Sequence, residues 1–229
     1  MSGNAGTQNH LMRGSAVFIS ASIPDPGRWE GSFDSFGIID AVVAVARTVL
    51  QNGGRLVTAA HPTIAPLLLY VGAEQLEEKE QQITVYQSAA FRPILPDATK
   101  RYERDGLGSI TWTEQIKDEP ADPALATKSL EHMRKRMLTE TTPVAAVFIG
   151  GMAGISDEYR LFHQLRSTAP TYAFGCPGGE AQTLVDKSPA RLQAELTKSK
   201  VYSTVARHIV DDVIQRLGKG GGLAVHDET

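Results

Sequence analysis

Hydrophobic and polar positions along the chain alternate between strand-like and helix-like patterns. Apolar runs that begin at Ala16 and span residues 144–149 are long enough for strands buried on both faces. Residues 36–52 instead carry apolar side chains at helical spacing, and this pattern stops at Gly53 and Gly54. The chain is therefore expected to begin with a buried strand followed by an amphipathic helix.

The same alternation continues along the rest of the chain. Further strands are expected at 55–60, 83–91, 108–115 and 171–174. Further helices are expected at 64–76, at 124–140, from Ser156 onward, from about Glu180 onward and at 201–217. Residues 92–108 are irregular and could hide a short helix. This order predicts an α/β fold with a Rossmann-like, doubly wound, mainly parallel sheet that is flanked by helices on both faces.

The regular patterns fill residues 15–217, which we expect to fold as a single domain. The chain has 229 residues, of which 41% are hydrophobic, so it can bury a substantial core. Residues 1–14 and 218–229 are rich in polar residues and glycine, and we expect both to be disordered tails.

Composition argues against several classes of function. The formal net charge of -3 does not indicate a protein dedicated to nucleic acid or to an anionic membrane. No apolar run reaches the roughly 18 residues of a membrane span, and the start of the chain lacks the apolar core of a signal peptide. Cys176, the only cysteine, is either a packed thiol or a nucleophile and cannot make a zinc site alone. We expect a soluble cytoplasmic protein without a metal or cofactor.

Two glycine-rich turns follow strands in the second half of the chain. Residues 150–154 precede a helix for which Ser156 is the expected N-cap, with Asp157 and Glu158 in the first turn. Gly178 and Gly179 similarly precede the helix expected near Glu180. Such turns let backbone N–H groups approach a phosphate, and turns after neighbouring parallel strands share one edge of the sheet. The alternative is that the glycines only tighten the turns.

Six short motifs occur in order along the chain: FISASIPD, HPTIAPLLL, YQSAAF, DGLGSITWT, HMRKRML and IGGMAGISDEYRLF. Together they resemble the prokaryotic TRPM-associated-type branch of the SLOG superfamily, over most of residues 16–186. The resemblance implies a Rossmann-like fold that binds nucleotides or nucleotide-derived signals. Relatives include the nucleotide-sensing domains of TRPM channels and the lonely-guy phosphoribohydrolases, which cleave the N-glycosidic bond of nucleoside monophosphates.

Bacterial members of the superfamily often accompany TIR domains, which consume NAD, in predicted antiviral defence systems. The resemblance therefore implies a sensor of ADP-ribose or cyclic ADP-ribose that self-associates and acts through a TIR-domain or effector partner. The alternative is a lonely-guy-like nucleotide N-glycosidase that uses Glu158 or Asp157 as its acid. Residues 149–158 depart from that enzyme pattern, PGGxGTxxE, because they have an extra residue before the third glycine and neither proline nor threonine. A third possibility is a structural subunit whose cleft has decayed.

A nucleotide phosphate needs hydrogen-bond donors at the carboxyl ends of the strands. The expected donors are serine hydroxyls, turn amides, His61, Arg92 and one arginine of the basic cluster 134–136. Trp29 and Trp112 could stack on a base or belong to the core. With Glu158 as the candidate catalytic residue, the predicted ligand contacts are Ser20, Ala21, Ser22, His61, Pro62, Thr63, Arg92, Gly150, Gly151, Met152, Gly154, Gly178, Gly179 and Glu180.

Overall fold

The computed structural model describes residues 11–59, 61, 63–74, 82–95, 97–105 and 109–220. Pro62, a predicted ligand contact, lies outside the described residues. Residues 11–14, which the sequence assigned to a disordered tail, form a turn instead. The Met12 amide donates to Asn52 O at 3.0 Å, and the Met12 side chain is fully buried. That buried side chain holds the turn against the protein, so the prediction of a disordered tail was wrong for residues 11–14.

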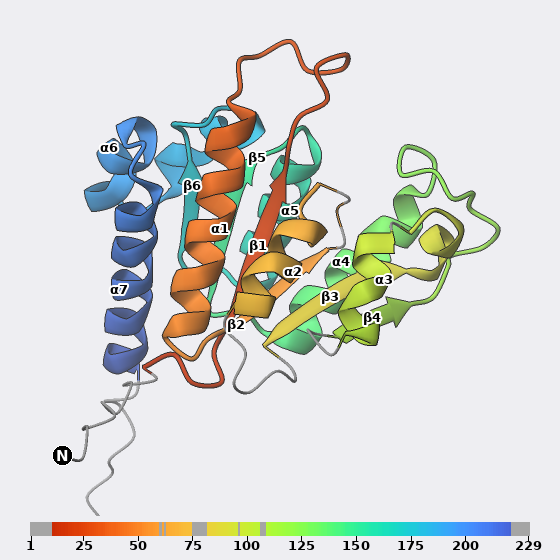
Figure 1. Ribbon diagram of the computed structural model, residues 1–229, viewed down its shortest axis with the longest axis horizontal. Helices are drawn as coiled ribbons and strands as arrows, with labels where there is room; N and C mark the ends of the chain where they lie inside the picture. Colours follow the sequence, from red (N-terminus) through yellow and green to blue (C-terminus); the bar gives the residue numbers. More distant parts are fainter. Residues whose placement is uncertain are drawn as a thin grey trace, which may run out of the picture.

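In the described part of the chain, six strands form one sheet in the order β4-β3-β2-β1-β5-β6 (Figure 1). They are β1 (Ala16–Ser22), β2 (Arg55–Ala59), β3 (Ile83–Ser88), β4 (Ser109–Thr113), β5 (Ala145–Gly150) and β6 (Thr171–Phe174). Every neighbouring pair is parallel, which confirms the predicted fold class. The direction of strand addition reverses between β1 and β5. In open parallel sheets, ligands bind beyond the carboxyl ends of the strands at such a point.

Helices cover both faces of the sheet (Figure 1). One face carries α1 (Ser35–Gln51), α2 (Ala65–Glu74), α6 (Ala190–Lys198) and α7 (Tyr202–Gly220), with α3 (Asp97–Arg104) packed against α2 and β4. The other face carries α4 (Thr127–Thr141), α5 (Gly154–Leu165) and the 3₁₀ helix η2 (Glu180–Lys187). A second 3₁₀ helix, η1 (Ala89–Ile94), follows β3 directly.

Successive side chains of β1 belong alternately to the two hydrophobic cores on either face of the sheet. Val17 and Ile19 belong to the core under α1 and α7, whereas Ala16 and Phe18 belong to the core under α4 and α5. Period-two alternation therefore places Ser20 on the α4 and α5 side, one step beyond Phe18 and next to the carboxyl end of the strand.

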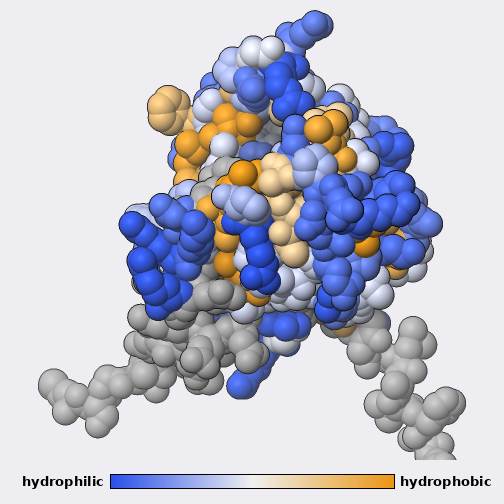
Figure 2. Space-filling view, turned by 90° about the vertical axis from the view of Figure 1, so that its right-hand side faces the viewer, coloured by the Kyte–Doolittle hydropathy of each residue, from blue (hydrophilic) through white to orange (hydrophobic). Residues whose placement is uncertain are grey.

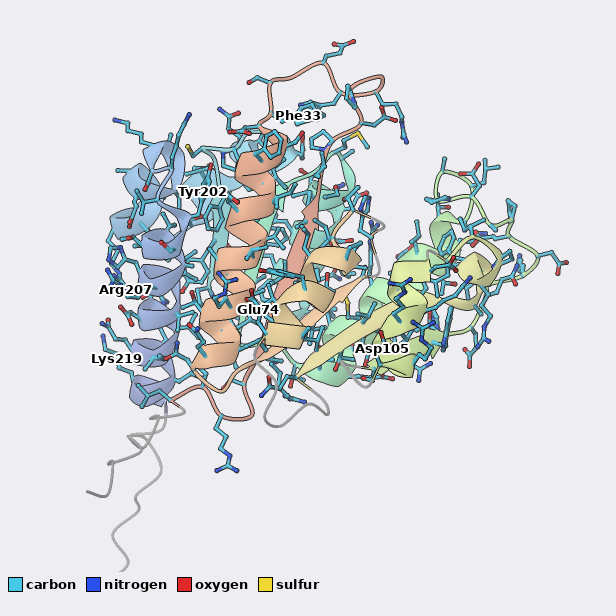
Figure 3. All side chains as sticks on the ribbon, viewed as in Figure 1. Phe33, Glu74, Asp105, Tyr202, Arg207 and Lys219 are labelled. Carbon is cyan, nitrogen blue, oxygen red and sulfur yellow. The ribbon has the colours of Figure 1, made fainter. Side chains whose placement is uncertain are left out.

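The α1 and α7 helices lie side by side, and both begin at the carboxyl edge of the sheet (Figure 3). The Asp34 carboxylate caps α1 by accepting from Gly37 N at 3.0 Å. A Cβ added to Gly37 would lie 2.7 Å from the Tyr202 hydroxyl, so α1 approaches α7 closely there. Arg207 and Lys219 extend from the outer side of α7 (Figure 3).

A buried ionic cluster joins α7 to β6 and α6. The Asp212 carboxylate, 4% exposed, accepts from the Tyr172 hydroxyl at 2.7 Å, from Arg216 Nε at 3.0 Å and pairs with Arg191 Nη2 at 2.6 Å. Burial opposes the charged form of Asp212, but hydrogen bonds from Arg191, Tyr172 and Arg216 outweigh it and lower the pKa of the carboxyl.

Several boundaries differ from the sequence-based expectation. The third strand ends at Ser88 instead of residue 91, because the Ser88 hydroxyl accepts from Ala90 N at 3.3 Å and begins η1. The α5 helix begins at Gly154, so Ser156 lies inside it and is not the N-cap. Ser156 Oγ instead donates to the Glu180 carboxylate. The short helix α3 lies in the irregular segment, and α6 was not expected.

Candidate functional site

A pocket of about 360 Å³ opens beyond the carboxyl ends of β1, β2 and β3, between η1 on one side and α4 and α5 on the other. Its volume falls within the range of ligand pockets, roughly 300–1,000 Å³. The lining consists of Ile19, Ser20, Ala21, Ser22, Arg28, Thr58, Ala59, His61, Gln87, Phe91, Ile94, Leu95, Pro123, Leu130, Met133, Arg134, Met152, Gly154, Ile155 and Glu158.

The floor of the pocket contains a buried hydroxyl. Ser20 is 3% exposed, and its Oγ has no hydrogen-bond partner among the residues that the structure describes. A buried hydroxyl without a partner costs about 1–3 kcal/mol. A ligand oxygen bound in the pocket would remove that cost.

Arg134 and Glu158 form an ion pair across α4 and α5 within the pocket. Arg134 Nε lies 2.8 Å from Glu158 Oε1, and both side chains are largely buried. A Cβ added to Gly154 would lie 3.2 Å from Arg134 Nη2, so the guanidinium extends over the N-terminus of α5. The Met152, Ala153 and Gly154 amides at this terminus have no acceptor within the described ranges. A guanidinium and free amides at a helix N-terminus together favour a bound anion.

His61 enters the pocket from the turn after β2. Its Nδ1 lies 2.8 Å from Thr63 Oγ1 and accepts from Thr63 N at 3.3 Å. Burial lowers the pKa of the imidazole, while the Glu158 charge partly opposes this shift. Near neutral pH, His61 is therefore a neutral ring.

The wall formed by η1 is apolar, and α4 adds apolar side chains beside Arg134. Phe91, Ile94 and Leu95 come from η1 and the residue after it, and Leu130 and Met133 come from α4. Ile94 is 52% exposed, so this wall continues to the surface. Figure 2 shows hydrophobic residues gathered on this side of the molecule and bordered by hydrophilic ones. One pocket thus offers charged groups together with an apolar surface.

In a comparison with known protein families, the chain matches the SLOG cluster3 family over residues 28–209. The chain belongs to the SLOG cluster3 family. This result confirms the membership in the SLOG superfamily that the motifs indicated, while the TRPM-associated-type branch stays a prediction. A comparison with curated proteins gave no match. The family suggests a nucleotide-related ligand-binding or glycosidase-like domain.

The structure brings part of the predicted SLOG site together. Seven predicted residues line the pocket, namely Ser20, Ala21, Ser22, His61, Met152, Gly154 and Glu158. Thr63 lies behind His61, outside the described lining. Asp157, the other candidate acid, points to the surface and pairs with Arg160.

Arg92 does not belong to the pocket lining that the structure describes. The Arg92 guanidinium lies 4.3 Å from the centre of the Trp112 ring, so this arginine stacks on an aromatic face. Neither tryptophan belongs to the lining that the structure describes.

The two glycine turns do meet, but outside the pocket. Glu180 N donates to Gly151 O at 2.9 Å, and a Cβ at Gly179 would lie 2.6 Å from Gly150 C. Several of their amides are already bonded within the chain: Gly151 N to Ser22 O at 2.7 Å, Gly178 N to Gly175 O at 3.0 Å and Gly179 N to Ser32 O at 3.2 Å. These glycines allow close backbone packing, and the geometry gives those amides no role toward an anion.

Sequence reasoning missed most of the remaining lining. Arg28 comes from the loop after β1, and Gln87 from the end of β3. Arg134 was one of the two arginines of its cluster that the sequence offered as a phosphate contact. Arg134 lies three residues before Met137 and four before Leu138, both of which are buried, and this spacing was the available signal.

Among the described residues, no group of three or more His, Cys, Asp or Glu side chains is arranged to hold a metal ion. In the same part of the chain, no helix has the length and apolar character needed to cross a membrane.

Proposed function

We propose that this SLOG cluster3 protein is a ligand-sensing domain for an NAD-derived nucleotide of the ADP-ribose or cyclic ADP-ribose type. The observation that carries the proposal is the unpartnered Ser20 hydroxyl in a pocket that also holds Arg134 and the free amides of α5. Family membership supports a nucleotide-related ligand. The choice of ADP-ribose and of a TIR-linked bacterial defence system rests on the motif resemblance.

The chemistry of the walls fits such a ligand. A phosphate at the N-terminus of α5 would accept hydrogen bonds from amide N–H groups and from the Arg134 guanidinium. The apolar side chains of Phe91 and Met133 would cover a base. The exposed Arg28 would attract the anion. We further propose that binding is passed on through self-association or through a TIR-domain or effector partner.

Calorimetry of the full chain against ADP-ribose, its cyclic isomers, NAD and AMP tests the proposal. We expect binding of at least one of these nucleotides, and a roughly tenfold loss in Ser20→Ala, since one hydrogen bond to a charged group contributes about 1.5 kcal/mol. Ser167→Ala, at an exposed serine outside the pocket, serves as the control. No binding of any nucleotide, or equal affinities in both variants, would count against the proposal.

The alternative is a nucleotide N-glycosidase, because Glu158 is a buried carboxylate that lines the same pocket. Its ion pair with Arg134 suits electrostatic stabilisation of a sugar cation better than proton donation. Chromatography of AMP and NAD after incubation separates the two functions. A glycosidase releases base and loses this activity in Glu158→Gln. A sensor releases none, and Glu158→Gln binds the anionic ligand more tightly because a competing carboxylate charge is gone.

A further inference from the structure

One hydroxyl connects two turns at the rim of the pocket. Thr63 Oγ1 accepts from Ile23 N at 3.3 Å and lies 2.8 Å from His61 Nδ1. Ile23 directly follows β1 and begins the loop that carries Arg28, whereas His61 follows β2. Thr63 therefore joins the segment that presents Arg28 to the segment that presents His61.

The hydrogen atoms in this contact can be assigned one by one. The Ile23 and Thr63 amides can only donate, so Thr63 Oγ1 accepts from Ile23, and His61 Nδ1 accepts from Thr63 N at 3.3 Å. The single proton of the Thr63 hydroxyl is then available for Nδ1. A neutral imidazole whose Nδ1 accepts carries its proton on Nε2.

We propose that Thr63 is a positioning residue that fixes His61 as the Nε2–H tautomer and presents this N–H to an acceptor oxygen of the bound ligand. Thr63 itself is half-buried behind His61 and does not belong to the described lining. The inference deepens the proposed function and rests on it for the identity of the ligand, but the tautomer belongs to the protein alone.

Among the surroundings of His61, the Glu158 charge favours a protonated ring, but burial outweighs it and lowers the pKa of the imidazole. The charged groups that share the pocket are Glu158 from α5, Arg134 from α4 and Arg28 from the loop after β1. Glu158 is already paired with Arg134. A proton on Nδ1, in the other tautomer or in the charged ring, would face the Thr63 N–H and lose that bond. The arrangement therefore favours the neutral Nε2–H ring.

Nitrogen-15 NMR of the imidazole rings in the full chain tests the tautomer without any ligand. The variant His61→Gln identifies the signals of this ring among the six histidines. We expect an unprotonated Nδ1 and a protonated Nε2 at pH 7.5 in the wild type and in Thr63→Ser. In Thr63→Val, which keeps the shape and the backbone N–H donor but lacks the hydroxyl, we expect a larger share of the Nδ1–H tautomer than in the wild type. A wild-type ring protonated on Nδ1, or an unchanged ring in Thr63→Val, would overturn the inference. A wild-type ring protonated on Nδ1 overturns the inference even where the valine variant fails to fold.

Calorimetry with ADP-ribose adds the functional readout. We expect about tenfold weaker binding in Thr63→Val, the size of one lost hydrogen bond, with recovery in Thr63→Ser. Equal affinity in Thr63→Val and wild type would refute the positioning role. If wild-type protein binds no nucleotide, the proposed function fails, and the NMR result alone decides the role of Thr63.

Discussion

Replacing Arg134 with methionine should destabilise the protein strongly, because it leaves the Glu158 carboxylate buried without its partner. Glu158 is 8% exposed, and its described ion-pair contact is Arg134 Nε at 2.8 Å. Removing one member of a buried ion pair costs about 3–5 kcal/mol. Since the pair borders a pocket, we expect a value near the lower end, about 3 kcal/mol.

The double variant Arg134→Met/Glu158→Gln removes both charges and should therefore recover much of this loss. Urea unfolding at pH 7 would measure the free energy of unfolding of both single variants and of the double variant. For a chain of this size, about 3 kcal/mol corresponds to a fall in the thermal midpoint of roughly 6–12 °C. The coupling energy between the two positions should exceed about 1 kcal/mol.

Arg136→Met is the matched control on the same helix. Arg136 pairs with Glu140 across one helical turn, and both side chains are substantially exposed, so its loss should cost no more than about 0.5 kcal/mol. Equal losses in Arg134→Met and Arg136→Met, or a double variant whose loss is the sum of the two single losses, would refute the reasoning.

Three further variants test other parts of the structure. Ser20→Ala should leave the free energy of unfolding unchanged or raise it, because it removes a buried hydroxyl that lacks a described partner; a loss above about 1 kcal/mol would contradict this. Gly179→Ala should cost about 2 kcal/mol, because φ is 74° and the added Cβ would meet Gly150, whereas Gly218→Ala, with open space around it, should not destabilise. Asp212→Asn should lose stability at neutral pH. The pKa of Asp212 is lower in the folded protein than in the unfolded chain. The stabilisation by the ionised carboxylate is therefore complete above the unfolded pKa and disappears as the pH falls through the folded pKa. The difference in stability between the wild type and Asp212→Asn should therefore shrink below about pH 4. A pH-independent difference would refute this assignment.

Local pattern was sufficient to predict the fold. The runs at 16–22 and 145–150 are apolar because those strands are covered on both faces, and the helical stripe of α1 buries its residues against the sheet and α7. Turns and 3₁₀ helices were harder to predict. The third strand was drawn too long because the Ser88 hydroxyl ends it through a contact with Ala90 N, and apolar content alone does not reveal that contact.

The candidate site was only partly predictable because it depends on long-range pairing. The glycine turns are adjacent, as neighbouring parallel strands require. The carbonyl groups that accept from their amides, however, belong to Ser22 at the end of β1 and to Ser32 in the loop after it, more than a hundred residues earlier. Arg134 and Glu158 similarly meet only because α4 packs against α5. Periodicity shows which face of a helix is buried, whereas the partner of a polar residue on the border of that face depends on the fold.

The balance of charge in the pocket connects these points to the proposed function. Arg134 is held by Glu158, so an anionic ligand must share or displace an existing partner. Arg28, which has no ion pair among the described residues, and the free amides at the N-terminus of α5 would supply further attraction. A carboxylate beside the phosphate position weakens binding, and for a sensor that weakening lets the ligand leave when its concentration falls. For a glycosidase the same carboxylate must face the sugar, and its present partner would first have to release it. The ion pair between Arg134 and Glu158 would therefore lower the affinity for an anionic ligand and would also keep the Glu158 carboxylate from a sugar. Both effects support the proposed sensor over the glycosidase.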